Sequence, residues 1–129
     1  MAAYLVDTDI LIDVLRRRNN RREHLYELAA GGSSFACSVI TLAELYAGVH
    51  LAQRGATEQL LEQLEIFDVT PTIARLGGAL RADWSQRGRT LSLSDTLIAA
   101  TAQHHKLELL TGNRKDFPML FPTAHPSET

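Results

Sequence analysis

Acidic residues recur where strands of the predicted sheet end. In an open parallel sheet, ligands bind outside the carboxyl ends of the strands, so residues at those points are the first candidates for chemistry. Carboxylates brought together without basic partners would repel one another, and a bound hard dication such as Mg2+ or Mn2+ usually relieves this repulsion. The acids at these points are Asp7 and Asp9 after the first expected strand, Glu44 after the second, Asp95 before the fourth and Asp116 after the fourth.

A dication held by such acids would favour one class of reaction. It polarises a phosphoryl oxygen, lowers the pKa of a bound water and, in pairs, clamps the attacking and leaving oxygens, so the pattern indicates phosphodiester hydrolysis. Two acids also have a structural interpretation, because Asp95 would complement a helix dipole and Glu44 would complete a capping box with Thr41. Asp7 is harder to explain in this way, since an acid at the end of a buried strand must be satisfied by amides or a cation.

The segments that must position these acids alternate between strand and helix. Short β-prone runs are separated by segments in which apolar residues recur at helical spacing. This alternation predicts an α/β fold with a mostly parallel sheet covered on both faces. The helix that carries Asp95 is expected to begin with Ser94 as its N-cap. The expected strands are 3–6, 34–38, 66–69 and 107–111.

The length and composition favour one globular domain. We expect a single domain over 1–129, with a loosely ordered tail at about 118–129 that contains three prolines. Cys37 is the only cysteine, which excludes an internal disulfide and leaves too few thiols for a zinc finger. The start of the chain has no basic leader and its apolar run stops at Asp7, so we expect a cytoplasmic protein with no membrane segment.

Two groups of basic residues could bind nucleic acid. The formal net charge is -2, so any such binding requires a local patch rather than a global field. Arg114 and Lys115 stand beside Asp116 and are expected to contact a phosphate near the acids. A second run of basic residues at the end of the first helix could bind RNA phosphates. Alternatively, these residues could form a solvated face whose cations complement the C-terminal end of the helix dipole. This run consists of Arg16, Arg17, Arg18, Arg21 and Arg22.

Four strings of the sequence carry a family resemblance. They are Leu5-Val-Asp7-Thr8-Asp9, Ser38-Val-Ile-Thr41-Leu-Ala-Glu44-Leu-Tyr-Ala-Gly48, Leu93-Ser-Asp95-Thr-Leu-Ile-Ala-Ala-Thr-Ala102 and Leu110-Thr-Gly-Asn113-Arg-Lys-Asp116-Phe117. In this order, over nearly the whole chain, they resemble the PIN-domain nucleases and, more narrowly, the VapC-type toxins of toxin–antitoxin pairs. The resemblance implies a three-layer α/β/α sandwich, an acidic Mg2+ or Mn2+ site and endonucleolytic cleavage of RNA.

The resemblance also implies roles for individual residues. Asp7 and Asp95 match direct metal ligands, and Glu44 and Asp116 complete the four-acid catalytic site directly or through water. Asp9 stands where many relatives have Asn, and its role as a fifth charge or a helix cap stays open. The remaining matches are Thr8 and Thr111, as hydroxyls that support the first and last acids, and Asn113, which competes with Asp116 for the fourth position.

Partners and alternatives follow from the same resemblance. Family members are generally inhibited by a small VapB-type antitoxin, and many form homodimers. One alternative is a non-catalytic binding module whose acids serve folding or bind antitoxin arginines. Another is a haloacid-dehalogenase-like phosphatase, which the string Asp7-Thr-Asp9 also resembles. That alternative needs a downstream lysine and paired acids, yet the only lysines are Lys106 and Lys115 and no Asp-Asp pair exists.

Overall fold

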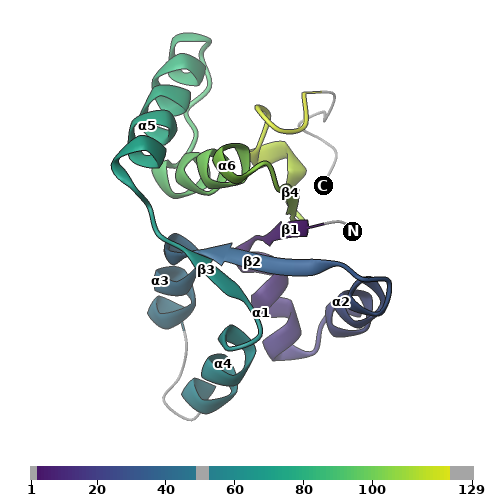
Figure 1. Cartoon of the computed structure of the whole chain (residues 1–129). Helices are drawn as coiled ribbons and strands as arrows, with labels where there is room; N and C mark the ends of the chain where they lie inside the picture. The colour runs from purple at the N-terminus through teal and green to yellow at the C-terminus, as the bar shows by residue number, and fades with distance from the viewer. Residues whose placement is uncertain (1–2, 49–52, 123–129) are drawn as a thin grey trace.

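The computed structural model describes residues 3–48 and 53–122, and within them four strands form one parallel sheet (Figure 1). The strands are β1 (Ala3–Val6), β2 (Ser34–Ser38), β3 (Glu65–Phe67) and β4 (Glu108–Leu110). They lie in the order β3-β2-β1-β4, so the N-terminal strand is internal to the sheet. In β1, Leu5 pairs with Ala36 of β2 and with Leu109 of β4. The predicted parallel sheet is confirmed.

Helices cover both faces of this sheet. The helices are α1 (Thr8–Arg16), α2 (Arg21–Ala30), α3 (Val39–Gly48), α4 (Arg54–Leu61), α5 (Pro71–Gln86), α6 (Leu93–His105) and the 3-10 helix η2 (Arg114–Asp116). Figure 1 shows α5 and α6 on one side of the sheet and α1 to α4 on the other. The expected three-layer α/β/α sandwich is confirmed. In the described part of the chain, no helix is long and apolar enough to cross a membrane.

The core lies on both faces of β1, because successive side chains of a strand point to opposite sides. Leu5 packs toward α6 with Ala99 and Ala102, whose small side chains let this helix approach the sheet closely. Val6 belongs to the opposite cluster, together with Cys37. Burial raises the pKa of the Cys37 thiol to about 11, which is the behaviour of a structural rather than a nucleophilic cysteine.

A close helix contact positions α6 and the acid at its start. A Cβ atom on Gly77 of α5 would lie 2.7 Å from Cδ2 of Leu97 and 3.2 Å from the Leu97 Cα. Only glycine allows α5 and α6 to approach this closely at this point, because the neighbour on α6 includes backbone. The N-terminus of α5 has the expected cap, since Thr70 Oγ1 accepts a hydrogen bond from Ile73 N at 3.2 Å.

Two predicted helix starts are wrong. The N-cap of α6 is Ser92 and not Ser94, because Ser92 Oγ accepts from Asp95 N at 3.1 Å. Helix α3 begins at Val39, directly after β2, where Ser38 Oγ accepts from Ile40 N at 3.0 Å. Thr41 therefore lies inside α3 and does not form the expected capping box. In both cases two serine or threonine residues stand near the helix start, and local spacing does not choose between them.

The C-terminal segment packs against the sheet layer for part of its length. Phe117 is buried with Leu5 and Ile98, and partly buried Met119, Leu120 and Phe121 pack against the same cluster. Residues 119–121, which were expected in a loosely ordered tail, thus contact the core. The rest of that expected tail, 123–129, lies outside the described residues.

Candidate active site

Asp7 is held between the ends of two neighbouring strands. It follows β1 and caps the N-terminus of α1, where its Oδ1 accepts from Thr8 N at 2.8 Å. Its Oδ2 accepts from the Thr111 hydroxyl at 2.7 Å, just beyond the end of β4. Only 6% of Asp7 is exposed. The carboxylate therefore has a fixed position at the carboxyl edge of the sheet.

Burial perturbs the ionisation of Asp7. Desolvation is the main reason why the pKa of this carboxyl rises from 3.8 to about 7, and the negative charge of nearby Asp9 raises the pKa further. The hydrogen bonds from Thr111 and from the Thr8 amide oppose this rise. A carboxyl group in this environment would be ionised much more readily with a cation beside it, so the site favours a positively charged ligand.

Glu44 reaches the same edge of the sheet through Thr8. The Thr8 hydroxyl lies 2.6 Å from Glu44 Oε1 and 3.0 Å from Thr41 Oγ1. A hydroxyl carries a single proton, and an ionised carboxylate only accepts, so Thr8 donates to Glu44 and accepts from Thr41. The expected roles of the two threonines require correction: the Thr8 hydroxyl supports Glu44, whereas Thr111 supports the first acid, Asp7, rather than the last.

Asp95 lies in the first turn of α6, positioned by the Ser92 cap. Its pKa is raised mainly by burial, and further by the negative charges of Asp116, Glu44 and Asp9, while the hydrogen bond with Ser92 lowers it. The fold therefore brings the charges of Asp9, Glu44 and Asp116 within electrostatic reach of Asp95.

Asp9 joins α1 to the loop that follows β4. Its Oδ2 accepts from Gly112 N at 2.9 Å and from Asn113 Nδ2 at 3.2 Å, and its Oδ1 accepts from Ile10 N at 2.9 Å. Asn113 N also donates to Thr111 Oγ1 at 3.0 Å. The side chain of Asn113 is thus engaged with Asp9, while the charge of Asp116 acts on Asp95. Asp9 holds the loop that leads to η2, a role that its spacing did not reveal.

Two residues of this region, Thr41 and Gly112, were not identified from the sequence as parts of the site. Thr41 orients the hydroxyl of Thr8, as described above. Gly112 allows a close approach, because a Cβ atom there would lie 2.7 Å from Asp9 Oδ2 and 2.8 Å from Arg21 Nη2. A glycine directly after a strand is the signal that could have indicated such an approach.

Of the basic residues expected to bind RNA, Arg114 has another side-chain contact in this structure. The guanidinium of Arg114 lies over the ring of Phe121, with 4.9 Å between Cζ and the ring centroid. The backbone carbonyl of Lys115 accepts a hydrogen bond from Arg89 Nη2, which ties η2 to the loop before α6. Arg16 is exposed at the last turn of α1. None of these contacts directs a cation toward the acids.

The donor atoms of the site are suited to a hard dication. Carboxylate oxygens are the ligands that Mg2+ and Mn2+ prefer, and Asp7 and Asp95 both have raised pKa values that a bound cation would reverse. Among the described residues, no three Asp, Glu, His or Cys side chains stand close enough to hold one ion. Mg2+ does not require such a cage, since one or two carboxylates commonly bind it while water and substrate phosphates complete its shell.

Comparison with known proteins gives a consistent result. Residues 4–118 match the model of the PIN domain family. The chain is 38% identical over 122 residues to the protein named Ribonuclease VapC19 of Mycobacterium tuberculosis, a match that covers 95% of this chain and 97% of the relative.

Similar chains have been solved as components of toxin–antitoxin complexes. A toxin–antitoxin complex from Klebsiella pneumoniae contains a chain that is 34% identical, with a TM-score of 0.75 and full coverage of both chains. VapBC2 from Rickettsia felis, bound to a DNA fragment from its promoter, contains a chain that is 27% identical. Its TM-score is 0.78, and the match covers 92% of each chain.

Proposed function

This chain belongs to the PIN domain family, and we propose that it is a metal-dependent endoribonuclease that acts as the toxin of a toxin–antitoxin pair. The resemblance to VapC-type proteins is confirmed by relatives that carry that name. The observation that carries the proposal is the placement of the acids: Asp7 is buried between the ends of β1 and β4, and Asp95 lies in the first turn of α6. The negative charges that act on Asp95 and raise its pKa support it. The family match over 4–118 leaves the haloacid-dehalogenase-like alternative without support.

The residues of the site divide into two roles. Asp7 and Asp95 would hold Mg2+ or Mn2+, which when bound supplies Lewis-acid polarisation of the phosphodiester and activation of water. Glu44, oriented by the Thr8 hydroxyl, accepts a hydrogen bond from the attacking water and fixes its direction. Asp116 completes the acidic site. It is favoured over Asn113 for the fourth position because the side-chain amide of Asn113 donates to Asp9.

Two sets of hydrogen bonds hold these acids in position for the reaction. The Thr111 hydroxyl and the Thr8 amide donate to the two oxygens of Asp7, so this carboxylate cannot rotate away from the edge of the sheet. Asp9 holds the loop that carries η2 and hence Asp116. Preorganisation of this kind favours an in-line reaction, because the groups do not have to be ordered when the substrate binds.

In this proposal, residues 1–129 form a single nuclease domain and its substrate is RNA. We propose a VapB-type antitoxin as its inhibitor and a homodimer as its assembly. Support for the antitoxin comes from the similar chains of Klebsiella pneumoniae and Rickettsia felis, which were solved within toxin–antitoxin complexes.

Cleavage of end-labelled single-stranded RNA tests the proposal. Protein purified free of antitoxin is incubated with Mg2+ or Mn2+ and, in parallel, with EDTA. Asp95→Asn keeps the shape of the side chain and removes its charge, so we expect cleavage to fall by at least 100-fold. Asp83→Asn is the matched control, because Asp83 is an exposed acid on α5 that pairs with Arg87 on the helix surface.

Two outcomes would contradict the proposal. Equal cleavage by wild type and Asp95→Asn would show that the activity does not depend on this site or comes from a contaminant. Metal binding without cleavage of any tested RNA would instead favour the non-catalytic binding module.

A further inference from the structure

The turn between α1 and α2 has an unusual backbone conformation. Arg17, Asn19 and Asn20 have φ values of 55°, 58° and 53°, in the left-handed region that residues other than glycine and asparagine rarely adopt. Asp13 holds the turn, since its carbonyl accepts from Arg18 N at 2.8 Å and its Oδ2 accepts from Asn19 Nδ2 at 3.0 Å. These contacts therefore fix the backbone of the turn from which the arginines project.

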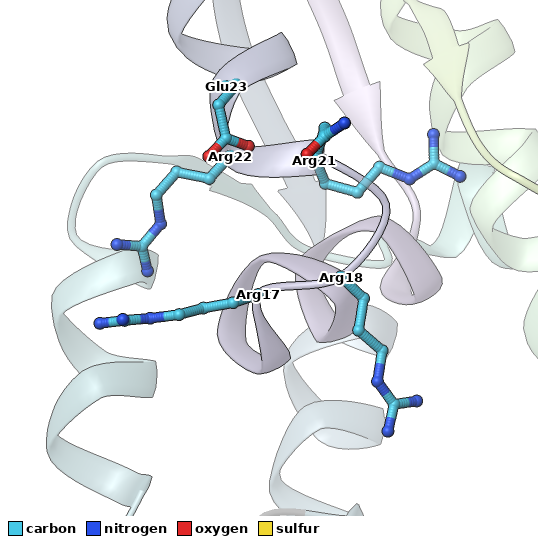
Figure 2. A pocket seen from close by; sticks show the side chains of 6 residues that line it. Arg17, Arg18, Arg21, Arg22 and Glu23 are labelled. Atoms are coloured by element: carbon cyan, nitrogen blue, oxygen red, sulfur yellow. The ribbon is translucent and has the colours of Figure 1, made fainter.

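These arginines line a pocket of about 250 Å³. In Figure 2, the side chains of Arg17 and Arg22 extend toward the same side, whereas Arg21 extends in the opposite direction. The two guanidinium groups on that side would bind backbone phosphates, because each guanidinium matches the oxygens of a phosphate with two parallel N–H donors. The residues lining the pocket are Arg17, Arg18, Asn20, Arg21, Arg22 and Glu23.

Arg21 connects this pocket to the acidic site. Its Nη2 lies 2.8 Å from the position that a Cβ atom of Gly112 would occupy, and Asp9 Oδ2 lies 2.7 Å from the same point. The guanidinium of Arg21 and the carboxylate of Asp9 therefore both contact the loop after β4. Arg21 is thus a positive side chain at the rim of the site, on the side where Asp7 and Asp9 follow β1.

Asp13 fixes Arg21 without using up its donors. Asp13 Oδ2 lies 3.2 Å from Arg21 Nε, and only 26% of the Arg21 side chain is exposed. Within residues 3–48 and 53–122, the Arg21 side chain makes one hydrogen bond, which Nε donates to Asp13. The two terminal nitrogens therefore keep their N–H donors for a ligand. A guanidinium held by one acid and directed along the rim of a site is preorganised to bind an anion.

We propose that Arg21 binds the RNA phosphate adjacent to the bond that is cut, and that the arginine-lined pocket of the α1–α2 turn binds the RNA backbone leading to it. This inference rests on the proposed nuclease function and names the surface along which its substrate lies. The negative charge that accumulates on the phosphodiester during cleavage would strengthen the contact with Arg21, so this residue contributes to the rate as well as to binding.

Binding and cleavage by Arg21→Gln test the first part. Affinity for a fluorescein-labelled single-stranded RNA is measured by anisotropy in EDTA, over a series of salt concentrations. We expect weaker binding, a salt slope that falls by about 0.7 for the lost phosphate contact, and a kcat/KM lower by at least 10-fold in Mn2+. Arg75→Gln, an exposed arginine on α5 with the same change in charge, is expected to match the wild type.

The pocket is tested by the double variant Arg17→Gln, Arg22→Gln. We expect weaker RNA binding and a smaller salt slope, because the phosphate contacts of these two guanidinium groups are lost. A fall in affinity no larger than that of Arg75→Gln would overturn the role of the pocket. Arg21→Lys, which keeps the charge but loses the fork of donors, should restore the salt slope and only part of the rate.

The outcomes separate this inference from the proposed function. If wild-type protein neither binds nor cleaves RNA, the nuclease proposal fails. If the wild type cleaves RNA and Arg21→Gln equals Arg75→Gln in affinity, salt slope and rate, the function stands and the role of Arg21 is overturned. Thermal unfolding of every variant checks the fold; if Arg21→Gln is unfolded, Arg21→Lys is used in its place, and a rate equal to wild type then overturns the role.

Discussion

Asp7 Oδ2 accepts a 2.7 Å hydrogen bond from the hydroxyl of Thr111, a residue 104 positions away in the chain. The two residues meet because β1 and β4 are neighbours in the sheet and both end at this edge, where Val6 pairs with Leu110. The same hydroxyl accepts from Asn113 N at 3.0 Å. Thr111 thus supports the first acid of the site and, at the same time, the loop that leads to Asp116.

Replacement of Thr111 by valine tests this contact. The substitution keeps the shape and removes the hydrogen bond that lowers the pKa of Asp7, so this pKa should rise further. We expect cleavage to fall about 10-fold at neutral pH, in line with about 1.4 kcal/mol for a tenfold change, and the rising limb of the pH profile to move to higher pH. Thr101→Val is the control, because the Thr101 hydroxyl donates to the Leu97 carbonyl within α6. A profile identical to wild type would contradict the assigned role.

The stability of the metal-free protein should depend on pH through Asp7. The pKa of Asp7 is raised in the folded state, so its contribution to stability is present below pH 3.8 and is lost as pH rises through about 7. Asp7→Asn removes this effect and should be more stable than wild type at pH 8 by about 2–4 kcal/mol, with the difference shrinking toward pH 4. Urea unfolding in EDTA at several pH values measures this, with Asp83→Asn as the control. A difference that does not vary with pH would show that Asp7 is not perturbed.

Divalent metal should oppose this effect. An ion at the proposed site would bind the ionised forms of Asp7 and Asp95 and would stabilise the folded state, by about 2.7 kcal/mol when its concentration is 100 times Kd. We expect Mn2+ to raise the Tm of the wild type at pH 7.5 and to leave Asp7→Asn and Asp95→Asn nearly unchanged. Thermal unfolding with Mn2+ or with EDTA gives the comparison. An equal increase in all three proteins would place the binding site elsewhere.

The cap of α6 offers a matched pair of substitutions. Ser92 caps the helix and holds Asp95 in its first turn, whereas Ser94, two residues later, does not cap it. Ser92→Ala should therefore lower the free energy of unfolding by about 1 kcal/mol and reduce cleavage by displacing Asp95. Ser94→Ala should lower the free energy of unfolding by less than Ser92→Ala does, because Ser94 Oγ contacts Ser92 Oγ at 3.3 Å, whereas Ser92 Oγ accepts from the amide of Asp95. Equal effects of the two substitutions would be inconsistent with the observed cap.

Much of the architecture could be predicted because it depends on local signals. Buried parallel strands require short apolar runs, and the runs that end at Val6 and Ser38 form β1 and β2 with the expected bounds. Helix starts were less certain, because Ser92 and Ser94 are both suitable caps and the packing of α6 against α5 and the sheet decides between them. The acids could be identified as candidates because each follows a strand or begins a helix, positions that the order of elements places at one edge.

The partners of these acids could not be predicted in the same way. Thr8 supports Glu44, Thr111 supports Asp7, and Asp9 holds the loop at Gly112, although these pairs lie 36, 104 and 103 residues apart in the chain. Such hydrogen bonds form only after β4 and α3 have packed beside β1, since they depend on where two strand ends meet in space. Types and spacing of residues therefore indicated the acids of the proposed site, while the packing of distant segments determined which groups hold them.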